Sequence, residues 1–139
     1  MRKIIIASHH QLASGMVDTL NYIMPNIQNI TAIDAYMDNT PVEDAIKESL
    51  NDLSATDEAL IFTDLLGGSV NQAFVPYLSK GNIHVVTGMN LPVIMTLLLA
   101  LGGTPIEPAQ IQTAIEESQT QLLYVNDFIK EQAMDEEDE

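Results

Sequence analysis

Two residues of this sequence, His9 and Asp64, could together support nucleophilic chemistry, because each follows an apolar run typical of a buried strand. Residues 4–7 form the run that leads to His9, and residues 59–63 form the run that leads to Asp64. Open parallel sheets gather functional groups at the carboxyl ends of their strands. A carboxylate that accepts a hydrogen bond from one ring nitrogen of a histidine leaves the other nitrogen free to react. We therefore expect His9 and Asp64 to meet in one crevice.

A glycine turn, Gly67-Gly68-Ser69, follows Asp64 and leads into a predicted helix. Glycines let backbone N–H groups approach an oxyanion closely, a helix N-terminus attracts negative charge, and the Ser69 hydroxyl adds a donor. No Lys follows the turn at the spacing of a Walker loop. The turn is therefore suited to hold one small phosphoryl group carried on a side chain, rather than to hydrolyse ATP.

Each of these residues also has a purely structural interpretation. His9 could be a packing residue at a strand end, and Asp64 could be an ordinary turn residue before the glycines. His10 could compete with His9, although the side chains of adjacent strand residues diverge, so that only one should face Asp64. A metal site made of these three residues is the weakest alternative, because no further well-spaced ligand appears. We expect no metal and no cofactor, and we expect His84 to be a packing residue.

Strands and helices that could position these residues alternate along the chain. Strands are predicted at residues 4–7, 29–35, 58–63 and 83–87, and helices at 12–24, 40–50, 70–79, 90–101 and 108–118. Thr40, Ser69 and Asn90 are expected to cap the helices that follow them, and Pro76 is expected to bend its helix. A short final strand is predicted at residues 121–125.

Alternation of this kind predicts an α/β fold, with a doubly wound, mostly parallel sheet of order 2-1-3-4 and helices on both faces. In this order the switch point, where ligands bind in open sheets, lies between the first and third strands. Those two strands end at His9 and Asp64.

The composition indicates one globular domain and excludes several functions. The chain has 139 residues, of which 46% are hydrophobic, a net charge of −15 and no cysteine. Only five residues are basic (Arg2, Lys3, Lys47, Lys80 and Lys130), so no basic face can form for nucleic acid or for an anionic membrane. The absence of disulfides fits a cytoplasmic protein. The most apolar stretch, residues 91–101, is shorter than the roughly 20 residues that a spanning helix requires.

At its motifs the sequence resembles the IIA component of the mannose family of the bacterial phosphoenolpyruvate-dependent sugar phosphotransferase system. The resemblance covers residues 3–128 and rests on three motifs: Ile5-Ile6-Ala7-Ser8-His9, Phe62-Thr63-Asp64-Leu65-Leu66-Gly67-Gly68-Ser69, and Gly88-Met89-Asn90-Leu91-Pro92. It implies that His9 is the phosphoacceptor, that Asp64 orients the histidine and that Ser69 contacts the phosphoryl group. It differs at His10, where family members often carry a small residue.

The resemblance further implies a phosphotransferase component with a phosphohistidine intermediate. Such a protein accepts phosphate from phospho-HPr and passes it to a separate IIB component, which serves the membrane components IIC and IID. The expected protein is a cytoplasmic homodimer, peripherally associated with the transporter, whose subunits exchange the late antiparallel strand at residues 121–125. We expect the IIA domain to span residues 1–130 and residues 131–139 to form an acidic C-terminal tail, whose wholly acidic end, residues 135–139, is solvated and disordered.

Three other functions are alternatives. The nearest is the phosphoryl-donor subunit of dihydroxyacetone kinase, which shares the architecture and the histidine. A regulatory receiver domain would need a cluster of carboxylates after the first strand, and Ser8-His9-His10 supplies none. A flavin- or nucleotide-binding module is the third, and a bound chromophore or nucleotide after purification would favour it.

Overall fold

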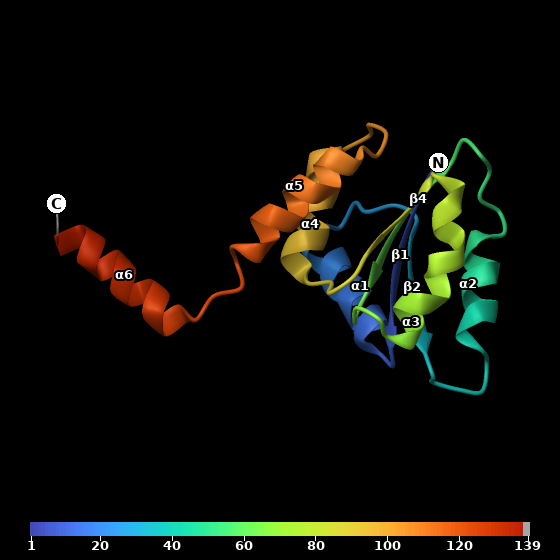
Figure 1. Cartoon of the computed structure of the whole chain (residues 1–139), viewed down its shortest axis with the longest axis horizontal. Helices are drawn as coiled ribbons and strands as arrows, with labels where there is room; N and C mark the ends of the chain where they lie inside the picture. Colours follow the sequence, from blue (N-terminus) through green and yellow to red (C-terminus); the bar gives the residue numbers. More distant parts are fainter. Residues whose placement is uncertain (138–139) are drawn as a thin grey trace. The chain divides into compact units, whose positions relative to one another are not determined.

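The central sheet has four parallel strands in the order β2-β1-β3-β4 (Figure 1). The computed structural model describes residues 1–137 and bounds the strands as β1 (Arg2–His9), β2 (Ile30–Ala35), β3 (Glu58–Thr63) and β4 (Ile83–Val86). Ala7 lies opposite Thr63 of β3, and His9 lies opposite Ala35 of β2. The predicted strand order is confirmed, and the carboxyl ends of β1, β2 and β3 meet at one edge.

The helices follow the predicted alternation. They are α1 (Leu12–Ile23), α2 (Val42–Leu50), α3 (Ser69–Phe74) with the 3-10 helix η1 (Val75–Lys80), α4 (Leu91–Leu101), α5 (Pro108–Gln119) and α6 (Val125–Glu137). The chain divides into two compact units, Met1–Met95 and the part from Thr96 onwards. The candidate site lies within the first unit. The boundary expected after residue 130 stays a prediction.

Both faces of the two central strands, β1 and β3, are buried over most of their length, as expected for parallel strands. Alternate strand residues point to opposite faces. One set packs with apolar residues of α2 and α3 in a single cluster, and α1 packs against β1 and β2 on the other face (Figure 1). The cluster comprises Ile5, Ala7, Ile33, Ala35, Val42, Ile46, Leu50, Ala59, Ile61, Val70, Phe74 and Ile83.

Phe74 should be a large contributor to the stability of this cluster, because it is fully buried and lies on the helix that begins at Ser69. We expect Phe74→Ala to lower the free energy of unfolding by about 3–5 kcal/mol through lost burial and a residual cavity. The neighbouring Val75 is 46% exposed, so Val75→Ala should cost less than about 1 kcal/mol. Urea unfolding of both variants measures the difference, and equal losses would contradict the assigned packing.

The predicted caps had mixed outcomes. Asn90 does cap α4, since its side chain accepts the N–H of Val93 at 2.8 Å. Thr40 does not cap α2: extended Pro41 occupies the cap position, and the N–H of Thr40 donates to the carboxylate of Asp38. The extended ψ of Pro41, 138°, keeps this residue outside the helix, so the helix begins at Val42 and Thr40 lies one residue too far away to cap it.

The third helix also differs in detail from its prediction. Gly68 is the cap residue of α3 and Ser69 is its first residue, so the predicted Ser69 cap is wrong. The hydroxyl of Ser69 contacts instead the side chains of His9, at the end of β1, and Tyr36, just after β2. The predicted bend at Pro76 corresponds to the change from α3 to η1, where proline removes a helical donor.

The expected strand at residues 121–125 is not present in the single chain. Residues 121–124 are irregular, and Val125 is the first residue of α6. A strand needs a neighbour to satisfy its backbone groups, and this segment pairs with none of the four described strands. Its apolar side chains are exposed, including Leu122 at 88%.

The expected disorder at the acidic end of the tail is wrong over residues 135–137, which belong to α6. The segment Lys130-Glu131-Gln132-Ala133-Met134 consists of strong helix formers, which explains the helix despite the acidic end. The last two residues of the predicted tail, 138–139, lie outside the described residues. Within residues 1–137, none of the helices is both long enough and apolar enough to cross a membrane.

Candidate active site at the carboxyl edge of the sheet

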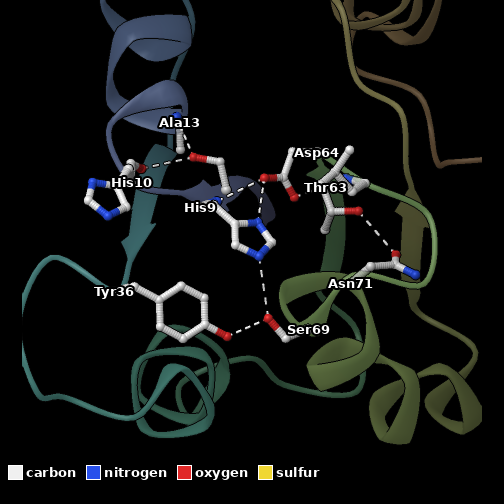
Figure 2. Close-up of polar contacts among 10 residues, drawn as sticks. His9, His10, Ala13, Tyr36, Thr63, Asp64, Ser69 and Asn71 are labelled. Atoms are coloured by element: carbon white, nitrogen blue, oxygen red, sulfur yellow. Dashed lines mark hydrogen bonds and ion pairs between the residues drawn. The ribbon is translucent and has the colours of Figure 1, made fainter.

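His9 and Asp64 are brought together at the ends of the adjacent strands β1 and β3 (Figure 2). The ring Nδ1 of His9 lies 2.8 Å from Oδ2 of Asp64, and the backbone N–H of His9 donates to the same oxygen at 2.8 Å. The other carboxylate oxygen accepts the N–H of Leu65 at 2.9 Å. Asp64 is therefore held by three hydrogen bonds, two of which come from His9.

The carboxylate of Asp64 is favoured in its ionised form. Burial by itself raises the pKa of Asp64, whose side chain is only 9% exposed, but the hydrogen bonds from His9 and the charge interaction with it outweigh burial and leave the pKa below its usual value. An ionised carboxylate beside Nδ1 keeps the proton of neutral His9 on that nitrogen. The lone pair is then on Nε2, and the side chain of His9 is 37% exposed.

Ser69 lies on the opposite side of the imidazole from Asp64 (Figure 2). Its Oγ is 3.4 Å from Nε2 of His9, which places a hydroxyl beside the free nitrogen. The ring of His9 thus lies between a carboxylate at Nδ1 and a hydroxyl near Nε2.

The two glycines before Ser69 allow this close arrangement. Gly67 has φ +73°, a conformation that other residues adopt only with strain. A Cβ on Gly68 would lie 3.2 Å from the carbonyl oxygen of Leu65 and 3.5 Å from Cε1 of His9. The N–H of Gly68 donates within the turn to the carbonyl of Leu65. Of the three residues in the turn, Ser69 is the one whose side chain reaches His9.

The end of β3 is tied to the two segments that follow it. The hydroxyl of Thr63 donates to Oδ1 of Asn71 on α3 at 3.0 Å, which anchors the first turn of this helix beside the strand. The carbonyl of Thr63 accepts the N–H of Met89 at 3.0 Å. The third sequence motif, Gly88 to Pro92, therefore begins next to Asp64.

His10 does not face Asp64. Its side chain is exposed and points away from His9, as Figure 2 shows, and its backbone has φ +52°. Buried Ser8 stabilises this turn, because its hydroxyl donates to the carbonyl of His10 and accepts the N–H of Ala13 in α1. The sequence-based expectation that the two histidines diverge is confirmed.

His84 is partly buried on β4, in keeping with the packing role expected of it. In the part of the chain covered by residues 1–137, no three or more His, Asp or Glu side chains are grouped so that they could hold a metal ion.

Tyr36 is a member of the site that the sequence motifs did not indicate. It directly follows β2, its hydroxyl is hydrogen-bonded to Oγ of Ser69, and its ring centroid lies 5.4 Å from that of His9 (Figure 2). The three sequence motifs lie at the ends of the first, third and fourth strands, and none lies at the end of the second. The predicted strand order could have indicated Tyr36. In that order β2 is the other neighbour of β1, so the residue after β2 must also lie near His9.

Comparisons with known proteins agree with the fold. A protein-family model described as the phosphotransferase system (PTS) fructose IIA component matches residues 3–114 of the chain. No curated protein matches the sequence significantly.

Several solved structures resemble the chain. A candidate phosphoenolpyruvate-dependent sugar PTS permease from Klebsiella pneumoniae is 29% identical with a TM-score of 0.86, and the match covers 92% of this chain and 93% of the other. The PTS component EIIA from Streptococcus agalactiae is 26% identical with a TM-score of 0.75, over 91% and 98% of the two chains. The mannose/sorbose-specific IIA subunit from Enterococcus faecalis shares the fold at 17% identity, with a TM-score of 0.71 over 88% and 93%.

Proposed function

This chain belongs to the mannose-type family of PTS IIA components, which are phosphotransferase components, and we propose that it carries a phosphoryl group on His9 from phospho-HPr to a IIB component. One observation supports this proposal most directly. His9 has Nδ1 bound to an ionised carboxylate at 2.8 Å, and Nε2 beside the Ser69 hydroxyl on the exposed side of its ring.

The proposed reaction is a reversible exchange between two imidazoles. The lone pair on Nε2 of His9 attacks the phosphorus of phospho-HPr, and a new N–P bond forms. The N–P bond to the histidine of HPr breaks, and its electron pair returns to that ring nitrogen. The proton on Nδ1 of His9 stays in its hydrogen bond with Asp64, which stabilises the positive charge that develops on the ring.

Ser69 has the second role in this mechanism. Its hydroxyl lies near enough to Nε2 to donate a hydrogen bond to an oxygen of the incoming phosphoryl group. Gly67 and Gly68 let the turn approach the ring without a side chain in the way. The phosphoryl group must leave again to the IIB component, so its binding has to be moderate rather than maximal.

The partners follow from the same proposal. HPr and a separate IIB component would approach the exposed face of His9, and IIB would connect the protein to the membrane components IIC and IID. We place the protein in the cytoplasm, in peripheral association with that complex. The net charge of −15 favours partners whose contact surfaces carry a basic rim.

Incubation of the purified protein with labelled phosphoenolpyruvate, enzyme I and HPr tests the proposal. We expect a label that is acid-labile and alkali-stable, as a phosphohistidine is, and that requires HPr. Absence of label under these conditions would overturn the carrier function.

The identity of the acceptor separates the two nearest functions. A purified IIB component should remove the label from the protein. If IIB leaves the label in place and the nucleotide-binding subunit of a dihydroxyacetone kinase removes it, the protein is the phosphoryl-donor subunit of that kinase instead.

The exposed apolar segment that leads into α6 supports a homodimer. Leu122, Leu123 and Tyr124 are 88%, 48% and 66% exposed, a pattern that marks an interaction surface. In the proposed dimer, residues 121–125 pair as a strand with an edge of the partner's sheet. Sedimentation should give twice the chain mass, whereas a double substitution Leu122→Asp and Leu123→Asp should give a monomer. A monomeric unmodified chain would contradict the exchange.

A further inference from the structure

We propose that Tyr36 is a positioning residue that directs the hydroxyl proton of Ser69 toward Nε2 of His9. The inference rests on the proposed phosphoryl carrier function and adds to its site a residue that follows the end of a third strand, β2. Three observations carry it: the hydrogen bond to Ser69, the ring contact with His9, and the backbone conformation of Tyr36 itself.

The direction of the hydrogen bonds follows from what each group can donate. Nε2 of neutral His9, with its proton held at Nδ1 by Asp64, can only accept. The Ser69 hydroxyl has one proton, and it can point either to Tyr36 or to His9. If the phenol of Tyr36 donates to Oγ, the single proton of Ser69 is left for Nε2.

The same orientation is the one that a phosphoryl group requires. The Ser69 Oγ lies 3.4 Å from Nε2, which is long for a hydrogen bond, so the contact with the free ring is weak. A phosphoryl group on Nε2 would offer oxygen atoms closer to this hydroxyl. A proton that already points toward Nε2 can bond to such an oxygen without reorientation, and the bond is then stronger in the phosphorylated form than in the free form.

The backbone of Tyr36 indicates that this position is specifically maintained. Its φ is +66°, which is unfavourable for a residue with a large side chain. Backbone strain of this kind concentrates at functional sites, where the surroundings enforce it. Here the ring lies 5.4 Å from that of His9 at an interplanar angle of 38°, and the hydroxyl reaches across to α3 (Figure 2).

Tyr36→Phe removes the hydroxyl and keeps the ring, so it separates the hydrogen bond from packing. We expect transfer from phospho-HPr to slow by up to about tenfold, the upper end of what one hydrogen bond between neutral groups contributes. The value of kcat should decrease and KM for phospho-HPr should stay unchanged, because the hydrogen bond from Ser69 strengthens only as the phosphoryl group arrives. Tyr22→Phe, at a tyrosine that is 88% exposed on α1, is the matched control and should behave as wild type.

A double-mutant cycle tests whether Tyr36 acts through Ser69. The variant with both Tyr36→Phe and Ser69→Ala should be no slower than Ser69→Ala alone, within about twofold. If the two losses multiply, Tyr36 acts independently of Ser69 and the inference is wrong. An unchanged rate in Tyr36→Phe would overturn it as well.

Nitrogen-15 NMR of the His9 ring tests, without any phosphoryl transfer, whether Tyr36 affects the hydrogen bond that Nε2 accepts. Both Tyr36→Phe and Ser69→Ala should move the Nε2 resonance in the same direction, because Ser69→Ala removes the hydroxyl that donates to this nitrogen and Tyr36→Phe leaves that hydroxyl free to rotate away from it. A resonance that moves in Ser69→Ala and stays in place in Tyr36→Phe would refute the role of Tyr36. If the unmodified protein took up no phosphate while both resonances moved, the carrier function would fail and the hydrogen-bond assignment would stand.

Discussion

The His9→Ala variant should take up no phosphoryl group from phospho-HPr, whereas His10→Ala should be labelled as well as the unmodified protein. His9 is the histidine whose Nδ1 is held by Asp64 and whose Nε2 lies beside Ser69. His10 is exposed and directed away from this pair. The two adjacent histidines are thus a matched pair of identical chemistry in different surroundings. Labelling from phosphoenolpyruvate through enzyme I and HPr measures the difference.

Loss of label in His9→Ala must reflect the missing nucleophile and not a misfolded chain. The side chain of His9 is 37% exposed, and the backbone N–H that binds Asp64 is retained in the variant. We therefore expect an unchanged circular dichroism spectrum and a cooperative unfolding transition in urea, with a midpoint lowered only by the loss of the ring hydrogen bond to Asp64. Label retained in His9→Ala and lost in His10→Ala would reassign the phosphoacceptor.

Asp64→Asn should slow phosphoryl acceptance by up to about 10⁴-fold, the loss known for an enzyme in which the carboxylate that orients the catalytic histidine becomes an amide. An asparagine NH₂ group can donate to Nδ1, which favours the tautomer with its proton on Nε2. That tautomer has no lone pair at the nitrogen beside Ser69. Pre-steady-state labelling from phospho-HPr measures the rate, and Asp38→Asn, an exposed carboxylate just after β2, is the control.

The same variant has a pH signature in stability. The pKa of Asp64 is lowered in the folded protein, because hydrogen bonds from His9 outweigh the opposing effect of burial. A depressed pKa stabilises the fold at pH values above the unfolded-state value of about 3.9, and this stabilisation is lost as pH falls through the folded-state value. Urea unfolding should therefore separate Asp64→Asn from the unmodified protein at pH 6 and bring the two together in acid. If the two proteins still differed in free energy of unfolding in acid, the stabilisation would not come from the ionised carboxylate of Asp64.

The two strand ends that form the site were predictable from the sequence. Short apolar runs predicted β1 and β3, and the α/β alternation predicted the order that makes them neighbours. From this alone the proximity of His9 and Asp64 followed, because parallel strands end at the same edge. The roles of Asp64, His9 and Ser69 in phosphoryl transfer stay predictions.

Helix caps were less predictable, because competing local groups decided them. Thr40 has the right side chain for a cap, but Pro41 takes the cap position and Asp38 binds the N–H of Thr40. Ser69 also has the right side chain, and its hydroxyl turns to Tyr36 and His9 instead. In both cases the winning partner depends on three-dimensional positions that residue type alone does not define.

By itself, the sequence determined which residues could carry chemistry and which strands would bring them to one edge, since hydrophobic periodicity and strand order are local and topological properties. Tertiary structure alone decided which ring nitrogen of His9 faces Asp64, that His10 turns away, and that Tyr36 reaches Ser69 across the end of β1. These outcomes depend on side-chain directions and on a left-handed backbone at Tyr36, which arise only when packing around the site overrides local preference.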